Sequence, residues 1–571
     1  MNRRIPLGLV IFAAFSAYGE KQFLWPEGKM PDAQPHQIAA MTNVSRAEGF
    51  NADEWRTPYL EWHEVPENPN GICAILLSGG SYRNLCDVTI VDDWRKKLTK
   101  LGCRCATLVY RTPWPKDLPY YQTAWQDGQR AVRLVRAAAA EKGYDPEKII
   151  TVSMSAGSHL ATLLATSSLS PSYEKIDTTD ELPCHINAAI AFAPAFVLTD
   201  GLGKPNTTGG DGPDVALDDC FKFDDKTAPM CLLHGGKDKY SPIGSTKIYR
   251  ELRKKKVNAE LHLFPNGGHR PYGFDRAVEF LRQLGMMGEL EKEVAVANRY
   301  KSDPEGVAYF REDVWPEGKI PDLQAAQNIP YIEWYIPSNL TTKAIQVIWS
   351  GGSYNRSKPL GYEVAPVRRY LNSKGMAVVT LCYRHPRPEG LEKHVTAWQD
   401  EQRTIRIVRS KATSYGLDSD HIGAMGFSAG GHLTLMAATS SLTASYSPID
   451  DVDKIPCNVQ WAIAIYPAYT LTEGNKDGGN YDSSKLVPEF AFDSATPPMM
   501  FLHGDTDGYV AMGSVKAWEQ LRRMGIQSEL HTLVKRGHCF QKTASPGTAS
   551  YNYLERISDY LNSCLHIGRE F

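Results

Sequence analysis

Two kinds of hydrophobic pattern alternate along the chain. Short runs of apolar and β-branched residues predict buried strands, and longer segments carry apolar residues at helical spacing. The N-terminal half predicts strands at 72–77, 103–110, 149–154, 188–192 and 230–234, and helices at 88–101, 126–142 and directly after Ser155. Strands that alternate with helices indicate βα units in a mostly parallel, doubly wound sheet with helices on both faces. Functional residues of such sheets lie at the carboxyl ends of the strands.

The pattern occurs twice. Four motifs return in the second half of the chain: 25–32 as 315–322, 77–82 as 349–354, 123–127 as 396–400, and 155–160 as 428–433. A repeat of about 270 residues indicates a duplicated domain. The offset falls from 290 to 272–273 after the first motif, so the first copy holds about 18 extra residues, which we expect in a surface loop. We predict domains at 20–290 and 306–571, joined by a charged linker at 291–305.

Composition and the N-terminal segment indicate which partners and which location to expect for the protein. A net charge of −2 over 571 residues gives no indication of a nucleic-acid or membrane partner. Basic residues at 3–4, an apolar run at 5–17 and small residues before a cut after Gly19 predict a signal peptide at 1–19. We therefore expect a secreted or periplasmic protein. The 11 cysteines include no C-x-x-C pair, so their spacing requires no disulfide.

One motif in each copy has the pattern of a nucleophile elbow. Ser428 lies in Gly-Phe-Ser-Ala-Gly, between a predicted strand and a predicted helix. Such a turn is tight, which restricts the flanking positions to small residues, and the helix N-terminus favours negative charge beside the serine. The alternative is an ordinary glycine-rich turn. In the first copy the equivalent Ser155 has Ser153 in place of the first glycine and Ser158 in place of a later one, so the site is either strained or decayed.

A serine nucleophile needs a base, and the base needs an acid that orients it. Asp238 and Asp507 align between the copies, whereas Asp505 aligns with Gly236, so we predict Asp507 as the acid and Asp505 as a turn-capping residue. A histidine follows the acid by 31 residues in both copies. These histidines, which we predict as the bases, are His269 and His538.

Two other aligned histidine pairs have a different expected role. His159 and His432 follow the serines by one helical turn, so we expect them to brace the elbow. His234 and His503 end a strand before the acid, and we expect them to pack or to form hydrogen bonds.

An oxyanion hole needs two backbone N–H groups. One is expected from the residue after the nucleophile, and the other from the Gly-Gly-Ser-Tyr loop after the first strand of each copy. The predicted residues are Ala156, Gly80, Ser81 and Tyr82 in the first copy, and Ala429, Gly352, Ser353 and Tyr354 in the second. The two tyrosines either flank a sugar or pack in the interior.

Each copy resembles an α/β-hydrolase, and within that fold the secreted carbohydrate esterases called acetylxylan esterase-like or feruloyl esterase-like. The resemblance rests on Ser-Gly-Gly-Ser-Tyr, on Gln-Asp-Glu-Gln-Arg at 399–403 and on Gly-Phe-Ser-Ala-Gly-Gly-His-Leu at 426–433. The chain departs from the family pattern Pro-Gly-Gly-Gly-Tyr, because serine replaces the proline and the third glycine.

This resemblance implies a serine esterase that deacylates a plant polysaccharide such as xylan, with acetyl as the first expected acyl group. It implies no metal and no cofactor. Two alternatives stay open: a dipeptidyl-peptidase-like serine peptidase, and one active esterase domain joined to a decayed scaffold or glycan-binding domain.

Overall fold

The computed structural model describes residues 20–40, 56–86, 88–199, 215–288, 302–473, 483–542 and 553–565. The predicted signal peptide and most of the predicted linker lie outside these residues. Contacts divide the chain into two compact units, the first with residues 1–150 and 171–184 and the second with 151–170 and 185–571. The second unit therefore holds Ser155 and much of the first copy together with the whole second copy. The domain bounds 20–290 and 306–571 stay a prediction.

The first unit contains the start of the first copy. Its strands lie in the order β1 (Glu20–Phe23), β2 (Tyr59–Trp62), β4 (Arg104–Val109) and β3 (Cys73–Leu77). Strands β3 and β4 are parallel, and the other neighbours are antiparallel. Its helices are α2 (Val88–Lys100), α3 (Gln122–Ala137) and α4 (Ala139–Lys142). The expected helix at 126–142 thus begins four residues earlier and is interrupted at Ala138.

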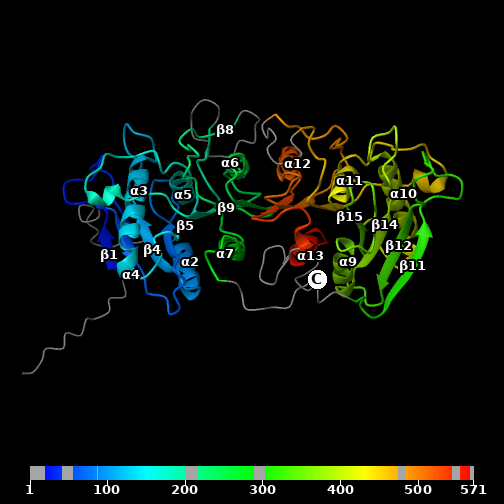
Figure 1. The fold of residues 1–571 in the computed structure, drawn as a ribbon, viewed down its shortest axis with the longest axis horizontal. Helices are drawn as coiled ribbons and strands as arrows, with labels where there is room; N and C mark the ends of the chain where they lie inside the picture. Colours follow the sequence, from blue (N-terminus) through cyan, green and yellow to red (C-terminus); the bar gives the residue numbers. More distant parts are fainter. Residues whose placement is uncertain are drawn as a thin grey trace, which may run out of the picture. The chain divides into compact units, whose positions relative to one another are not determined.

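The second unit contains a complete copy with the predicted alternation. Its strands lie in the order β18 (Glu529–Leu533), β17 (Met499–Gly504), β16 (Trp461–Ile465), β15 (Ile422–Phe427), β13 (Ile345–Trp349), β14 (Ala377–Cys382), β12 (Tyr331–Pro337) and β11 (Val307–Asp313). The strands from β18 to β14 are parallel, and β12 and β11 are antiparallel additions. The helices are α9 (Val364–Ser373), α10 (Val395–Lys411), α11 (Ala429–Thr439), α12 (Met512–Arg523) and α13 (Tyr553–Leu565) (Figure 1).

The remainder of the first copy in this unit follows the same plan. It has β5 (Ile149–Met154, whose first two residues belong to the first unit), β6 (Ala188–Phe192), β9 (Met230–Gly235) and β10 (Ala259–Phe264). Its helices are α5 (Ala156–Thr166), α6 (Ile243–Lys254) and α7 (Phe274–Gln283), and β7 (Leu198–Thr199) pairs with β8 (Ala216–Leu217). The prediction of tandem α/β-hydrolase copies, each built on a mostly parallel sheet, is confirmed.

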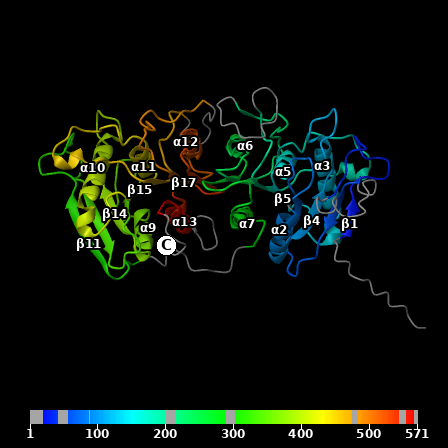
Figure 2. The same cartoon turned by 180° about the vertical axis from the view of Figure 1, so that it is seen from behind.

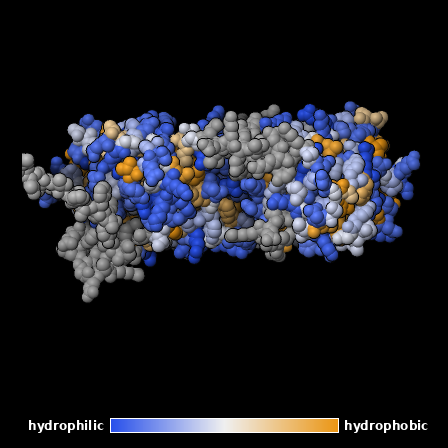
Figure 3. Space-filling model, turned by 90° about the horizontal axis from the view of Figure 1, so that it is seen from below, coloured by the Kyte–Doolittle hydropathy of each residue, from blue (hydrophilic) through white to orange (hydrophobic). Residues whose placement is uncertain are grey.

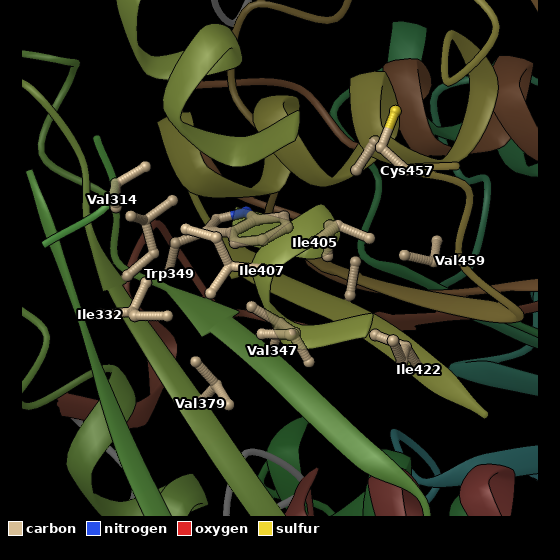
Figure 4. Close-up of a cluster of buried hydrophobic side chains, with 14 of the residues drawn as sticks. Val314, Ile332, Val347, Trp349, Val379, Ile405, Ile407, Ile422, Cys457 and Val459 are labelled. Carbon is tan, nitrogen blue, oxygen red and sulfur yellow. The ribbon is translucent and has the colours of Figure 1, made fainter. Parts of the chain in front are cut away.

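The core of the second copy explains why its strands are apolar without alternation. Every residue of β13 is buried, because helices cover both faces of the sheet. Trp349 and Val347 of β13 pack with Ile405 and Ile407 of α10 (Figure 4). By contrast, hydrophilic side chains predominate on the surface in Figure 3, with hydrophobic ones interspersed. No helix among the described residues is long and apolar enough to cross a membrane.

Two of the repeated motifs hold the fold together away from the serines. In the second copy the Trp315 indole donates a 2.7 Å hydrogen bond to buried Asp400, which also forms an ion pair with Arg384 at 2.9 Å. In the first copy Trp25 donates to Asp127 at 2.8 Å. Breaking such a buried pair is costly, so these motifs are needed for stability in both copies.

The two copies join edge to edge, which the hydrophobic pattern does not predict. Strand β10 of the first copy pairs antiparallel with β18 of the second, and His262 lies opposite His531. These histidines are equivalent residues, 269 positions apart, so the join has local two-fold symmetry. Their Nδ1 atoms lie 2.8 Å apart. The outer nitrogens bond to Glu260 at 2.9 Å and to Glu529 at 2.5 Å, so a buried Glu-His-His-Glu chain crosses the seam.

Helices α6 and α12 lie side by side over this seam (Figures 1 and 2). Arg250 and Glu519 are equivalent positions that carry opposite charges, and they form a 3.2 Å ion pair. Arg253 faces Asp505 at 3.4 Å, whereas the equivalent Arg522 donates to the carbonyl of Gly236 at 2.7 Å. Asp505 therefore forms an ion pair across the seam with Arg253. The expectation that it caps its own turn did not include this contact.

Candidate active site

The backbone of both elbow serines is in the strained conformation that a nucleophile elbow requires. Ser428 lies between β15 and α11 with φ 54° and ψ −118°, and Ser155 lies between β5 and α5 with φ 59° and ψ −123°. Non-glycine residues rarely take positive φ, and such strain clusters at functional sites. The Ser428 N–H donates to Ile465 at 3.0 Å and its carbonyl accepts from Ala468 at 3.0 Å, so neighbouring β16 and its following loop fix the turn.

Crowding explains the small residues around the elbow. A Cβ added to Gly426 would lie 2.2 Å from the carbonyl oxygen of Gly430, so glycine is required there in the second copy. The first copy has Ser153 at this position. Its hydroxyl lies 3.1 Å from that of Ser158, and both donate to carbonyls of β6, at 2.9 Å each. Each hydroxyl gives its one proton to β6, so both serine replacements are satisfied by that strand, and Ser155 retains the elbow conformation.

The second copy assembles the three predicted residues into a connected chain of hydrogen bonds. His538 Nε2 lies 2.7 Å from Ser428 Oγ, and His538 Nδ1 lies 2.8 Å from Asp507 Oδ2. This order of contacts is the one that the predicted roles require, with the predicted base next to the serine and the predicted acid behind it. Ser428 is 6% exposed, whereas the His538 side chain is 26% exposed, so solvent reaches the site on the histidine side.

The surroundings keep Asp507 ionised. Burial alone would raise its pKa, but hydrogen bonds from His503 and His538 lower it to about 2. The backbone N–H of Tyr509 donates a further 2.8 Å bond. His503 itself bonds to Ser514 at 2.9 Å and is fully buried, which agrees with the hydrogen-bonding role expected for it. A charged Asp507 can both orient His538 and stabilise its protonated form.

The first copy has the acid and the base in contact but not the complete chain. His269 Nδ1 lies 2.8 Å from Asp238 Oδ2, and hydrogen bonds from His234 and His269 outweigh burial and lower the pKa of Asp238. Within the described part of the chain, no hydrogen bond joins His269 to Ser155. The His269 ring instead packs on Tyr240, with centroids 4.9 Å apart.

The predicted oxyanion loop of the second copy lies against the nucleophile. A Cβ added to Gly351 would lie 2.8 Å from Ser428 Cβ, so the loop backbone approaches the serine closely. Gly352, Ser353 and Tyr354 all have positive φ, which turns the chain sharply here. Among the described residues, the N–H groups of Gly352 and Ala429 have no hydrogen-bond partner. Two unpaired N–H groups near a serine are what an oxyanion hole supplies.

Glu363, which the sequence did not single out, positions this loop. It is buried, and its Oε2 accepts a 2.9 Å hydrogen bond from the Gly351 N–H. Its Oε1 accepts from the hydroxyl of Tyr466 at 3.2 Å, and the Tyr466 ring packs on His538 with centroids 4.9 Å apart. Glu363 thus connects the loop to the base through one tyrosine. A glutamate 65 residues before the serine gives no local sequence signal.

The two predicted tyrosines belong to the interior. Tyr354 is fully buried and its hydroxyl lies 2.8 Å from His432 Nδ1, which are the surroundings expected of a packing residue. His432 braces the elbow helix against the loop, as expected. In the first unit Tyr82 is 1% exposed and packs on Tyr110 and Tyr120, and the Ser81 carbonyl accepts from Trp114. Gly80 has φ 128° in the same loop, and Ala156 begins α5.

A pocket of about 260 Å³ opens beside the second-copy loop. It is lined by Gly351 and Gly352, by Glu363, and by the exposed cationic side chains of Arg356 and Lys358 together with others. Glu363 is already held by the loop and Tyr466, so the free charge at the pocket is positive. The pocket lies beside the loop, and its lining includes neither Ser428 nor His538.

The cysteines take no part in either site as disulfides. All 11 cysteines fall among the described residues, and no disulfide is formed there. Eight of them are buried and act as small apolar residues, as expected.

Comparison with known proteins places both copies in one family. The family model described as BD-FAE matches residues 72–208 and 332–485, one stretch in each copy and together about half of the chain. The acetylxylan esterase of Xylanibacter ruminicola is 25% identical over 225 residues, which cover 36% of this chain and 42% of that protein. The probable carboxylic ester hydrolase LipM of Mycobacterium tuberculosis is 24% identical over 237 residues, covering 38% and 49%.

A solved structure, the acetyl ester-xyloside bifunctional hydrolase from Caldicellulosiruptor lactoaceticus, is 23% identical with a TM-score of 0.39, covering 47% of this chain and all of that one. The chain spans about half the length of the curated relatives it matches. With both copies matched by one family model and an elbow serine in each, the chain belongs to the BD-FAE family of α/β-hydrolases.

Proposed function

We propose that this protein is a serine esterase whose principal site is the second copy. The observation that carries the proposal is the hydrogen-bonded chain from Ser428 through His538 to Asp507, with contacts of 2.7 and 2.8 Å. No comparable site in the described residues joins a nucleophile, a base and an acid in this way.

The reaction follows from these contacts. Ser428 Oγ attacks the ester carbonyl carbon while its proton moves to His538 Nε2, and the negative oxygen is stabilised by the N–H groups of Gly352 and Ala429. The carbon–oxygen bond to the alcohol then breaks, and His538 returns the proton to the leaving oxygen. Water, deprotonated by His538, hydrolyses the acyl-serine and regenerates the free enzyme. Asp507 stays charged throughout.

For the substrate, we propose an acyl ester on a plant polysaccharide such as xylan, with acetyl as the acyl group. The proposal is supported by relatives named acetylxylan esterase and endo-1,4-beta-xylanase B. A secreted or periplasmic location, which the N-terminal segment predicts, would bring the protein to such a polymer. The first copy is proposed to be the weaker site, because its base is not joined to Ser155.

The test compares p-nitrophenyl acetate and acetylated xylan with a chromogenic dipeptide. We expect turnover of both esters, and loss of it in Ser428→Ala. Turnover of the dipeptide alone would establish the peptidase alternative instead. Ser155→Ala is the matched control in the first copy, and we expect it to retain most of the activity. Loss of activity in Ser155→Ala with full activity in Ser428→Ala would reverse the ranking of the two sites.

A further inference from the structure

Three polar side chains of the second copy converge beside the active site without a role in the proposed reaction. His394 precedes α10, His432 lies in the first turn of α11, and Glu489 lies between β16 and β17. One nitrogen or oxygen of each lies within 4.8 Å of the others. His432 Nε2 is 3.2 Å from Glu489 Oε1, and His394 Nδ1 is 3.7 Å from the same oxygen.

His394 is the residue that the protein alone leaves unsatisfied. Its side chain is 9% exposed, and its Nδ1 atom has no hydrogen-bond partner in the described part of the chain. A buried polar atom without a partner destabilises the folded state unless something satisfies it. Glu489 Oε1 lies 3.7 Å from Nδ1, which is beyond hydrogen-bonding distance. A ligand bound between these atoms would satisfy His394 Nδ1.

The types of side chain suit a metal ion. Imidazole nitrogens and carboxylate oxygens are common ligands of zinc in proteins.

The spacing also suits a metal ion. Zinc binds nitrogen and oxygen ligands at about 2.0–2.2 Å in tetrahedral geometry, which places neighbouring ligand atoms about 3.3–3.5 Å apart. The observed separations of 3.2 and 3.7 Å bracket this value. The other nitrogen of His432 lies 2.8 Å from the Tyr354 hydroxyl, and an outer contact of this kind normally fixes the ring of a metal-bound histidine.

We propose that the second copy binds one divalent metal ion, zinc by the type of its ligands, through His394 Nδ1, His432 Nε2 and Glu489 Oε1. The fourth position is left for water. The family resemblance implied no metal, and these residues, which are 38 and 57 positions apart, have no motif spacing. Only the fold brings them together.

The ion would hold segments of the fold together and would take no part in the reaction. It would join the start of α10, the first turn of the elbow helix α11 and the segment before β17. Through His432 it would also fix Tyr354, which belongs to the loop beside Ser428. The proton and nucleophile assignments of the esterase proposal are unaffected by it.

The first copy offers an internal comparison. The residues equivalent to His394, His432 and Glu489 are Tyr121, His159 and Cys220. His159 packs on Phe221 with ring centroids 5.1 Å apart, and its Nε2 lies 3.9 Å from the Cys220 sulfur. With tyrosine and cysteine in place of histidine and glutamate, this copy lacks the ligand set, so we expect one ion per chain.

The experiment measures metal binding by the full chain, without reference to its activity. The protein is stripped with a chelator, titrated with zinc chloride by calorimetry, and its metal content after dialysis is determined by mass spectrometry. We expect about one zinc per chain. His394→Tyr, which introduces the first-copy residue, should lower the affinity at least about 100-fold. His421→Tyr, the same change at an exposed histidine, is the matched control and should bind as the parent does.

Two results would overturn the proposal. One is a parent chain that binds no zinc at this site, and the other is binding that survives in both His394→Tyr and Glu489→Gln. Circular dichroism of the metal-free variants, compared with the metal-free parent, separates lost ligands from lost folding. Because Glu489→Gln keeps the size of the side chain, it decides the outcome if His394→Tyr does not fold.

Discussion

The seam between the copies makes the stability of the protein depend on pH in a calculable way. A neutral imidazole carries one N–H, so of the two facing Nδ1 atoms one donates and the other accepts. The histidine that donates from Nδ1 must accept at Nε2, which requires a protonated glutamate at that end. Burial raises the pKa of Glu260 to about 8 and that of Glu529 to about 7, so Glu260 is the end that keeps its proton.

The sign of the effect follows from proton counting. Above pH 6.5 the unfolded chain has neutral histidines and ionised glutamates, whereas the folded chain still holds a proton on Glu260 and, up to about pH 7, on Glu529. The folded state binds more protons, so stability falls as the pH rises. Below pH 6.5 the unfolded histidines take up protons that buried His262 and His531 do not, because burial lowers their pKa. The two effects offset each other there.

The magnitude is about 3 kcal/mol. At about 1.4 kcal/mol per pH unit and proton, Glu260 contributes about 2 kcal/mol between pH 6.5 and 8, and Glu529 about 0.7 kcal/mol between pH 6.5 and 7. In Glu260→Gln, the amide nitrogen can donate to His262 and the amide oxygen can accept from the Val534 N–H, which bonds to Glu260 at 2.9 Å. Glutamine stays neutral, so about 2 kcal/mol of the decline should disappear.

The assay is urea unfolding at a series of pH values from 6.5 to 8. The two seam glutamates should lower the unfolding free energy of the parent by about 3 kcal/mol over this range, and Glu260→Gln should lose about 2 kcal/mol less than the parent. Glu555→Gln, at an exposed position on α13, is the control and should follow the parent. The reasoning is refuted if the parent does not lose stability over this range, or if Glu260→Gln declines as steeply as the parent.

Other predictions separate the roles of individual residues. Asp507→Asn should lower kcat/KM about 10⁴-fold, because His538 loses its orienting charge. Asp505→Asn should leave ester hydrolysis intact. Equal losses in both variants would contradict the choice of Asp507 as the acid. Arg250→Glu should destabilise the seam by about 1 kcal/mol in thermal unfolding, by opposing Glu519, and the swap Arg250→Glu with Glu519→Arg should restore it. Ser153→Gly should destabilise the protein by about 1 kcal/mol, through the loss of its buried hydrogen bonds, and a more stable variant would show that this serine strains the elbow.

The sequence was sufficient for the features that local pattern and repetition determine. Apolar runs predicted the strands, and alignment of the two copies selected Asp507 over Asp505, although the catalytic roles themselves stay proposals. The sequence left the elbow conformation of Ser155 open, because it could not show that the hydroxyls of Ser153 and Ser158 both bond to β6.

Features that depend on pairing between distant segments were not predictable. To predict the seam, one must know which strand lies at the edge of each copy. An edge strand has the same hydrophobic pattern whether or not another strand pairs with it. Glu363 and Glu489 look like any other acidic residues in the sequence, and their partners come from other parts of the fold. These contacts between distant segments can be identified only from the tertiary structure.

The central claim is that Ser428 is the principal nucleophile. Its most direct test is covalent labelling of the parent chain with a fluorophosphonate, followed by peptide mass spectrometry of both elbow serines. The account predicts that Ser428 is labelled, faster than Ser155, and that its labelling parallels the loss of ester hydrolysis. Complete inactivation with an unlabelled Ser428 would contradict it.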